Sequence, residues 1–438
     1  MRDLLLIGFV LGTVPFILAR PYIGVLLFAW LGYMNPHREF AWDLAQDFPL
    51  SMVVGAVTLI SMVWSRDTRK LPFTPIMIVW FLWIFWTNIT TFFALVPEEA
   101  SLGWEKSMKV QLMTLVTVML LQSKERILLL VWVIAYSVGY YGIKGGIFSI
   151  QTGGQFRVWG PEYTFFAGNN EVGLALLMVL PLMFFLRNQS SERWIRLAIL
   201  LGTGLTIVAV IGTYSRGAFV AAAVALAFLA TKLRQKVVLV PLLLIGAAGL
   251  AAFMPEQYYE RIETITNYEE DGSAMGRINA WTVSWRLAMD RPLVGGGFNT
   301  FTEELYERYL PEVDVGNPDV HSIYFQALAE HGFVGCGLFV LLLLMALYQA
   351  RAIRKAVRDR PDMKWAADLA SMTQVGIVAY AVGGAFLGLA NFDLYYHLIA
   401  ILILTRLEVK RGAVTGDASE LVHRAAKGVR QPRLGSSP

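Results

Sequence analysis

The chain is poor in charge and almost free of cysteine. Only 16% of its 438 residues are charged, 56% are hydrophobic, and the single cysteine is Cys336. One cysteine excludes an internal disulfide and a metal cage built from cysteine ligands. A soluble protein of this size keeps more polar residues to cover its surface. The composition therefore excludes an ordinary soluble domain and indicates a membrane protein.

The alternating ten-residue pattern of a transmembrane β-barrel is also absent. Instead, runs such as 76–95, 237–254 and 333–348 approach the roughly 20 apolar residues that span about 30 Å of hydrocarbon. Backbone in lipid must satisfy its own hydrogen bonds, so these runs are expected to be helices. We predict an all-α integral membrane protein with about 12 transmembrane helices. The candidate runs lie near 4–19, 21–34, 50–64, 75–94, 107–121, 127–143, 171–186, 197–213, 217–231, 237–254, 333–350, 371–390 and 394–405.

Lysine and arginine in the short connectors predict the orientation. They fall on one side, which the positive-inside rule assigns to the cytoplasm, in the connectors 66–70, 124–126, 187–196, 232–236 and 351–364. This places 144–170 and 255–332 outside. Four regions follow: helices with short loops over 1–254, an outer loop over 255–332, further helices over 333–405, and a tail over 406–438. The tail is basic and rich in small residues, so we expect it to be cytoplasmic and disordered.

The outer loop 255–332 is acidic, and its five basic residues are all arginines. The planar guanidinium group binds phosphate through two hydrogen bonds, although ion pairing with the loop's own carboxylates is the alternative. The periodicity predicts a helix over 273–290 and a second over 302–309, with a tight connection at 295–297. The loop is therefore expected to be a folded helical cap on the outer surface.

Two arginines lie where an anion could be bound near the outer face. Arg216 lies in Thr213–Gly217, between two spans, where an arginine is costly unless it is paired or faces water. Arg277 is expected to open the first loop helix, whose N-terminal N–H groups favour an anion. Arg286 follows nine residues later on the same helix.

A histidine precedes the span that begins at Phe333. His321, Tyr324 and Leu328 are expected on one helical face. Histidine is the side chain best suited to take a proton near neutral pH, whereas a hydrogen-bonded structural histidine is the alternative.

These three segments, in this order, resemble the O-antigen ligase and polymerase family. Its members show Ser-Arg-Gly after a span, as at 215–217, and Gly-Arg…Trp…Pro-Leu-x-Gly-x-Gly, as at 276–297. They also show His-(Asn/Ser)-x-Tyr-x-Gln-x-Leu-Ala-Glu-x-Gly, as at 321–332, where this chain has Ser322 in place of the common Asn. The resemblance covers about 170–345. The segment 20–37, with Arg-Pro-Tyr-Ile-Gly…Tyr-Met-Asn-Pro-His, and the triplet Asn169-Asn170-Glu171 are similar to O-glycosylation ligases found beside exosortase systems.

The resemblance implies a GT-C-like glycosyltransferase in the bacterial inner membrane, with its site facing the periplasm. It implies transfer of a glycan from undecaprenyl diphosphate to a hydroxyl of lipid A–core, with inversion at the anomeric carbon, as in an O-antigen ligase. His321 would be the base, and Arg216, Arg277 and Arg286 would contact the diphosphate. Arg157, Asn170 and Tyr324 are supporting candidates; Arg157 lies among aromatic residues that would stack on sugars or seat in headgroups.

No cofactor, metal or nucleic acid is expected as a partner. Arginines at the interface can neutralise a leaving diphosphate in place of a divalent ion, and no His/Asp cluster has ligand spacing. An O-antigen polymerase and a protein O-oligosaccharyltransferase are rival readings that differ in the acceptor. A lipid or sugar transporter is a rival of another class, and it predicts charges buried mid-span and internal repeats.

Overall fold

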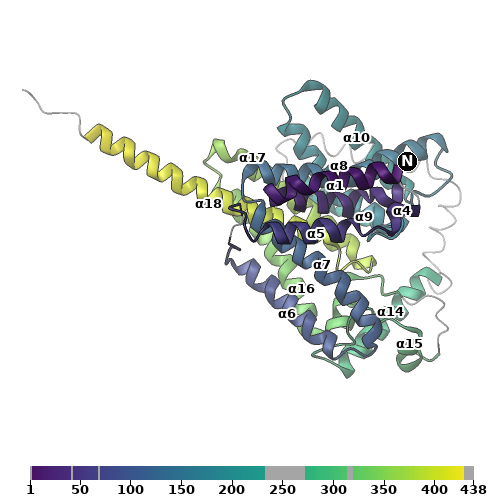
Figure 1. Ribbon diagram of the computed structural model, residues 1–438. Helices are drawn as coiled ribbons and strands as arrows, with labels where there is room; N and C mark the ends of the chain where they lie inside the picture. The colour runs from purple at the N-terminus through teal and green to yellow at the C-terminus, as the bar shows by residue number, and fades with distance from the viewer. Residues whose placement is uncertain (1, 41–42, 68–69, 232–271, 313–318, 429–438) are drawn as a thin grey trace, which may run out of the picture.

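The computed structural model describes residues 2–40, 43–67, 70–231, 272–312 and 319–428. This part of the chain consists of helices and their connections, without a strand (Figure 1). The all-α prediction is confirmed for these residues. The apolar run expected at 237–254 lies outside them.

Most of the long helices coincide with hydrophobic runs of the sequence, but the span expected over 371–390 ends as an α-helix at Gly383, before the connection 384–392. The helices before the outer loop are α1 Arg2–Ala19, α2 Pro21–Met34, α3 Pro36–Glu39, α4 Asp43–Asp47, α5 Leu50–Ser61, α6 Pro75–Phe92, α7 Pro97–Leu120, α8 Lys124–Gln151, α9 Asn169–Gln189, α10 Arg193–Gly212 and α11 Arg216–Ala230. Those that follow are α14 Gly272–Asp290, α15 Glu303–Tyr309, α16 Ile323–Ala356, η1 Pro361–Met363, α17 Lys364–Gly383, η2 Gly384–Phe386 and α18 Asp393–Gly428.

Seven helices among the described residues are long and apolar enough to cross a membrane. They comprise α1, α6, α8, α9, α10, α16 and the stretch from η1 through α17 to η2; α2, α5 and α11 are shorter apolar helices. The chain is therefore a multi-pass membrane protein. A total of about 12 crossings stays a prediction, because it rests on hydropathy.

The core of the bundle lies around α9, α17 and α18. All residues 394–405 of α18 are buried, where α18 packs against α7, α8, α16 and α17. Small residues permit close helix contact in such bundles: a Cβ added to Gly376 of α17 would lie 2.7 Å from the carbonyl oxygen of Met178 in α9. Beyond the core, α18 projects from the bundle as a long single helix (Figure 1). It is helical to Gly428, into the tail that we expected to be disordered.

Two of the basic connectors meet at one end of the bundle. Arg126 pairs with Asp67 at 3.0 Å, and Gln122 donates to the carbonyl of Lys70 at 3.2 Å. Arg411 of α18 donates to the carbonyl of Gln122 at 2.6 Å. These contacts bring Asp67, Lys70, residues 122–126 and Arg411 of α18 together, so two of the predicted cytoplasmic connectors lie at the same end. We call the opposite end, with connectors 93–97, 152–168, 213–215 and 384–392, the site end.

The predicted helical cap is present in the outer loop. Helix α14 matches the helix expected over 273–290, and α15, capped by Thr302, matches the one over 302–309. The two helices share a small apolar core with the start of α16, formed by Ala280, Val283, Leu287, Leu305, Tyr306 and Ala329. Because α16 continues into the bundle, the cap is anchored directly on a membrane helix.

Helix α16 is kinked at Gly332, which has φ 68° and ψ −172°. A Cβ there would lie 2.3 Å from the carbonyl oxygen of Leu293, so glycine is needed both for the backbone conformation and for the close approach. The amide N–H of Phe333 donates to the carbonyl of Pro292 at 2.8 Å. The kink therefore joins α16 to the Pro292–Gly297 turn of the cap.

Candidate functional site

Arg216 is the first residue of α11 at the site end. Ser215 caps this helix by accepting a hydrogen bond from the amide of Ala218 at 3.1 Å. Tyr214 has φ 53°, so the connector turns sharply before the cap. Arg216 is half-buried. The Ser215 cap and the turn at Tyr214 therefore fix the position of the Arg216 backbone at the start of α11.

The start of α9 packs against the same connector. The Asn169 side chain, which is buried, donates to the carbonyl of Thr213 at 2.8 Å. Glu171 folds back toward the helix cap, since a Cβ on Gly168 would lie 2.0 Å from its Oε2. Asn170, the supporting candidate from the sequence, is half-buried between them. Asn169 is therefore the residue of this triplet that anchors the Arg216 connector.

His321 lies in the loop that leads into α16, and not on the helix. We expected it to share a helical face with Tyr324 and Leu328, but the helix begins at Ile323 with Ser322 as its N-cap. His321 has φ 45°, a conformation outside the helix. The expectation failed because the residue spacing alone does not show that Ser322, the residue directly after His321, is the N-cap of the helix.

Asp319 orients the His321 ring. Its Oδ2 lies 3.3 Å from His321 Nδ1, and its Oδ1 accepts from the His321 amide at 3.5 Å. Both side chains are partly open to solvent, at 37% and 47% exposure. A carboxylate on one ring nitrogen leaves the other nitrogen to exchange a proton, as in Asp–His pairs of hydrolases.

Arg277 lies in the second turn of α14, near the N-terminal end of the helix that it was expected to open. Four residues on, Trp281 stacks on Phe325 of α16, with ring centroids 5.2 Å apart and planes 12° apart. Further along, Trp285 meets Phe333 edge-on at 5.8 Å. The two helix segments therefore lie side by side, with Arg277 four residues before Trp281 on α14 and His321 four residues before Phe325 in the loop that leads into α16.

The segment 384–388 joins these parts. A Cβ on Gly384 would lie 2.7 Å from Ile323, and one on Gly388 would lie 3.0 Å from Asp319 Oδ1. On the other side, a Cβ on Gly217 would lie 3.4 Å from Phe386. The starts of α11 and α16 therefore flank one short segment, with Arg216 and His321 beside it.

Charges of both signs gather around this segment. The Glu171 carboxylate is within electrostatic range of Arg277 and Asp319. Tyr306 of α15 is also affected by Asp319: burial, and to a smaller extent that carboxylate, raise the pKa of Tyr306 to about 12. This phenol stays protonated at neutral pH, so it is no rival to His321 as a base.

Arg286 and Tyr324 make structural contacts in this state of the protein. The Arg286 guanidinium donates to the carbonyl of Tyr309 at the end of α15. The Tyr324 hydroxyl donates to the carbonyl of Ala381 in α17 at 2.7 Å. Neither is placed beside His321 by the contacts described. Arg157 lies in the loop between α8 and α9.

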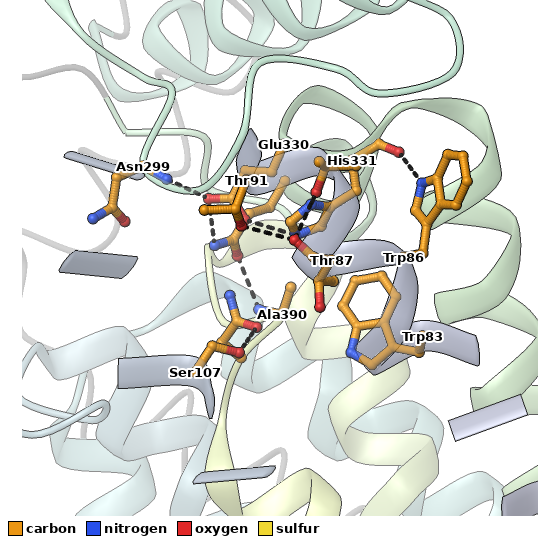
Figure 2. Close-up of polar contacts among 12 residues, drawn as sticks. Trp83, Trp86, Thr87, Thr91, Ser107, Asn299, Glu330, His331 and Ala390 are labelled. Atoms are coloured by element: carbon orange, nitrogen blue, oxygen red, sulfur yellow. Dashed lines mark hydrogen bonds and ion pairs between the residues drawn. The ribbon is translucent and has the colours of Figure 1, made fainter. Parts of the chain in front are cut away.

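A buried polar hub lies directly below the cap (Figure 2). Glu330 and His331 of α16 are both about 2% exposed or less. Glu330 Oε1 accepts from the amide of Asn299 at 3.2 Å and from the Gln326 side chain at 3.2 Å. Gln326 in turn accepts from the amide of Ala390 at 2.9 Å. Glu330 thus links the cap, α16 and the connection after η2.

His331 extends the hub to α6. Its Nδ1 lies 2.7 Å from the hydroxyl of Thr90, and its carbonyl accepts from the Trp86 indole at 3.0 Å. The rings of Trp83 and Phe298 enclose it edge-on, at 5.2 and 4.6 Å. Figure 2 shows the side chains of Glu330 and His331 between α6 and the segment around Asn299. The hub is enclosed, so it supports the site and does not face a substrate.

The glycines of the Pro292–Gly297 turn serve the same junction. The amides of Gly296 and Gly297 donate to the carbonyls of Ala329 and Glu330 at 2.8 and 2.9 Å. Gly295 and Gly297 have positive φ, and a Cβ on Gly297 would lie 2.5 Å from Ala94. The segments 276–297 and 321–332, which both resemble motifs of the family, are therefore joined by backbone hydrogen bonds.

Sequence reasoning missed Asp319 and Glu330. The signal for Asp319 is its spacing of two residues from a histidine. The signal for Glu330 is a Glu-His pair entering an apolar run, where unpaired charge is costly. In the described residues, no three His, Cys, Asp or Glu side chains are grouped to hold a metal ion.

Two family models match the chain. Residues 201–340 match the model described as O-Antigen ligase. Residues 1–191 match a model described as a family of unknown function (DUF5935). A comparison with curated proteins finds no match. The first match contains Arg216, Arg277 and His321, and the whole of the described cap.

Proposed function

Because the chain belongs to the O-antigen ligase family, whose model matches residues 201–340, we propose that it is a glycosyltransferase acting as an O-antigen ligase. It transfers a glycan from undecaprenyl diphosphate to a hydroxyl of lipid A–core. The reaction occurs at the periplasmic face of the bacterial inner membrane, with the site end facing the periplasm. The site end is opposite the basic connectors, which agrees with that orientation.

In the proposed mechanism the acceptor hydroxyl attacks the anomeric carbon of the donor sugar. Its oxygen forms the new glycosidic bond while the bond from carbon to the diphosphate oxygen breaks, so the anomeric centre inverts. The hydroxyl proton passes to His321, whose Nδ1 is oriented by Asp319. The leaving undecaprenyl diphosphate carries the negative charge, which Arg216 and Arg277 stabilise; such preorganised charge contributes several kcal/mol.

The observation that carries this proposal is that the Asp319–His321 pair lies across the 384–388 segment from Arg216, and that Glu171 is within electrostatic range of both Asp319 and Arg277. It combines a proton acceptor with two fixed cations at the end of a membrane bundle. A lipid-linked diphosphate donor fits a site at this end of the bundle, because its lipid lies in the bilayer and its sugar lies outside. Arg286 is a weaker diphosphate ligand, since its guanidinium already binds the cap backbone.

A transfer assay with purified protein tests the proposal. Wild type, His321→Ala, Arg216→Ala and Arg277→Ala are incubated with an undecaprenyl-diphosphate glycan and lipid A–core in EDTA. We expect wild type to form product in EDTA, and each variant to lose activity by about 10²-fold or more. Arg308→Ala is the matched control, because Arg308 pairs with Asp290 on the exposed face of the cap.

The acceptor panel separates the rival activities. Elongation of the glycan without lipid A–core would identify a polymerase, and labelling of a serine- or threonine-containing protein would identify a protein O-oligosaccharyltransferase. Full activity of His321→Ala would remove the proposed base. Activity lost in EDTA and restored by a divalent ion would overturn the metal-free mechanism.

A further inference from the structure

A cavity of about 610 Å³ opens at the site end. Its walls are the last part of α8, from Tyr140 to Gln151, and the loop residues 157–161. Glu39 of α3 lies at its edge. The mechanism above uses none of these residues, so the cavity needs its own explanation.

One positive charge in this cavity is uncompensated. The Arg157 guanidinium lines it and makes no hydrogen bond or ion pair to any residue that the structure describes. Lys144 is different, because it donates to Glu39, which also accepts from the Tyr140 hydroxyl at 3.4 Å. The Lys144–Glu39 pair is neutral as a whole. Arg157 therefore leaves the cavity with a net positive charge, and a ligand with an anionic group fits it.

The rest of the cavity is apolar and continuous with the membrane-facing side of α8. Trp159 lines it with 61% of its surface exposed, beside Phe148 at 40%. Along α8, exposed apolar residues recur at helical spacing, at Leu129, Trp132, Tyr136 and Ile147. An exposed indole at the membrane interface can stack on a sugar ring, and the row of exposed apolar residues along α8, which we call the α8 stripe, can contact acyl chains.

The cavity is also joined to the diphosphate side of the site. The amide of Val158, in its wall, donates to the carbonyl of Gly212 at 2.8 Å, at the end of α10. The Tyr214 hydroxyl donates to the carbonyl of Gly154. The same connector then leads into Arg216. The cavity wall and Arg216 are thus on two sides of one short connector.

We propose that this cavity binds the headgroup of a membrane-anchored anionic glycolipid. A phosphate or carboxylate of the headgroup pairs with Arg157, a sugar ring packs on Trp159, and the acyl chains lie along α8. The inference rests on the proposed function in one respect, because the proposed function makes this glycolipid the acceptor of the transferred glycan. A serine- or threonine-bearing peptide has no chains for the α8 stripe, so the cavity favours a lipid acceptor.

Direct binding tests the inference without requiring transfer. Lipid A–core in detergent is titrated into wild type, Arg157→Ala and Arg157→Lys, and binding is measured by microscale thermophoresis. Losing a charge-assisted bidentate contact should raise the Kd about tenfold in Arg157→Ala. Arg157→Lys keeps the positive charge but cannot form two parallel hydrogen bonds, so an intermediate Kd is expected. The control Arg308→Ala should bind lipid A–core with the wild-type Kd. Equal affinity of Arg157→Ala and wild type would overturn the proposal.

The chemistry of the ligand is tested with two further probes. Lipid A–core stripped of its phosphates should bind wild type about as weakly as the intact glycolipid binds Arg157→Ala. Inorganic phosphate should not displace the glycolipid, because it lacks the sugar and the acyl chains. If phosphate alone competes at the same concentration, the site takes a free anion and the glycolipid assignment is wrong.

The transfer assay separates this inference from the proposed function. Arg157→Ala should raise the KM for lipid A–core and leave the KM for the lipid-linked donor unchanged. If lipid A–core binds in an Arg157-dependent way but accepts no glycan, the assignment of the cavity as a glycolipid site is supported and the proposed acceptor is wrong. If transfer occurs with an unchanged acceptor KM, the ligase stands and the cavity proposal falls.

Discussion

At the scale of single residues, Asp319 has the clearest role that sequence reasoning did not assign. Its carboxylate lies 3.3 Å from His321 Nδ1, and both residues precede α16 in a loop. Asp319→Asn keeps the size but loses the charge that orients the ring. We expect the kcat for transfer to fall by about 10²-fold while the acceptor KM changes little.

The Asp319 prediction is checked by steady-state kinetics on single and double variants. Residues that act as one unit are non-additive, so His321→Ala with Asp319→Asn should be no slower than His321→Ala alone. Asp290→Asn serves as the control, because Asp290 accepts from Arg308 and Tyr309 on the outer face of the cap. Additive losses in the double variant would mean that Asp319 acts independently of the histidine.

Glu330 is expected to matter for stability more than for chemistry. It is buried, and its Oε1 accepts from Asn299 and Gln326. Glu330→Ala leaves both donors unsatisfied and opens a cavity, which costs about 3 kcal/mol or more. Glu330→Gln keeps an acceptor oxygen, so it should cost clearly less. Thermal unfolding in detergent ranks the two variants, and the opposite order would show that the hub needs no acceptor at this position.

At the scale of elements, hydropathy predicts the helices well, and helical periodicity also predicts α14 and α15. Both signals are local, since each helix satisfies its own backbone. The pairing of the Pro292–Gly297 turn with Ala329–Phe333 is not local, because it joins backbone groups far apart in the chain. The same holds for the stack of Trp281 on Phe325, which brings α14 beside the start of α16. The sequence therefore predicts which residues the site contains better than it predicts how they meet.

The kink in α16 offers an internally controlled prediction. Gly332→Ala meets a positive φ and a Cβ position 2.3 Å from a carbonyl oxygen, whereas a Cβ at Gly337 in the same helix meets nothing within 4 Å. Gly332→Ala should destabilise the protein by about 2 kcal/mol or more and lower transfer by detaching the cap. Gly337→Ala should be neutral or slightly stabilising. Equal melting temperatures for the two variants would show that the cap does not depend on the kink.

At the scale of the whole molecule, the orientation can be tested through the lone cysteine. Replacing Cys336, which is half-buried in α16, with alanine gives a background free of thiols. Phe156→Cys lies at the site end and Trp194→Cys at the start of α10, where the native side chains are 59% and 70% exposed. An impermeant maleimide should label Phe156→Cys, but not Trp194→Cys, in cells with a permeabilised outer membrane. Labelling in the reverse pattern would place the site in the cytoplasm and exclude the proposed donor geometry.

The central position of α18 has a consequence for how the protein is made. Residues 394–405 fill the middle of the bundle, yet they follow the helices that they pack against and leave the ribosome after them. Until they arrive, α7, α8, α16 and α17 have no partner on the faces that α18 will cover. Every earlier helix can already be inserted while the centre is still filled by lipid or by the insertion machinery. The centre of the bundle is therefore completed only when α18 joins the helices that precede it in the chain.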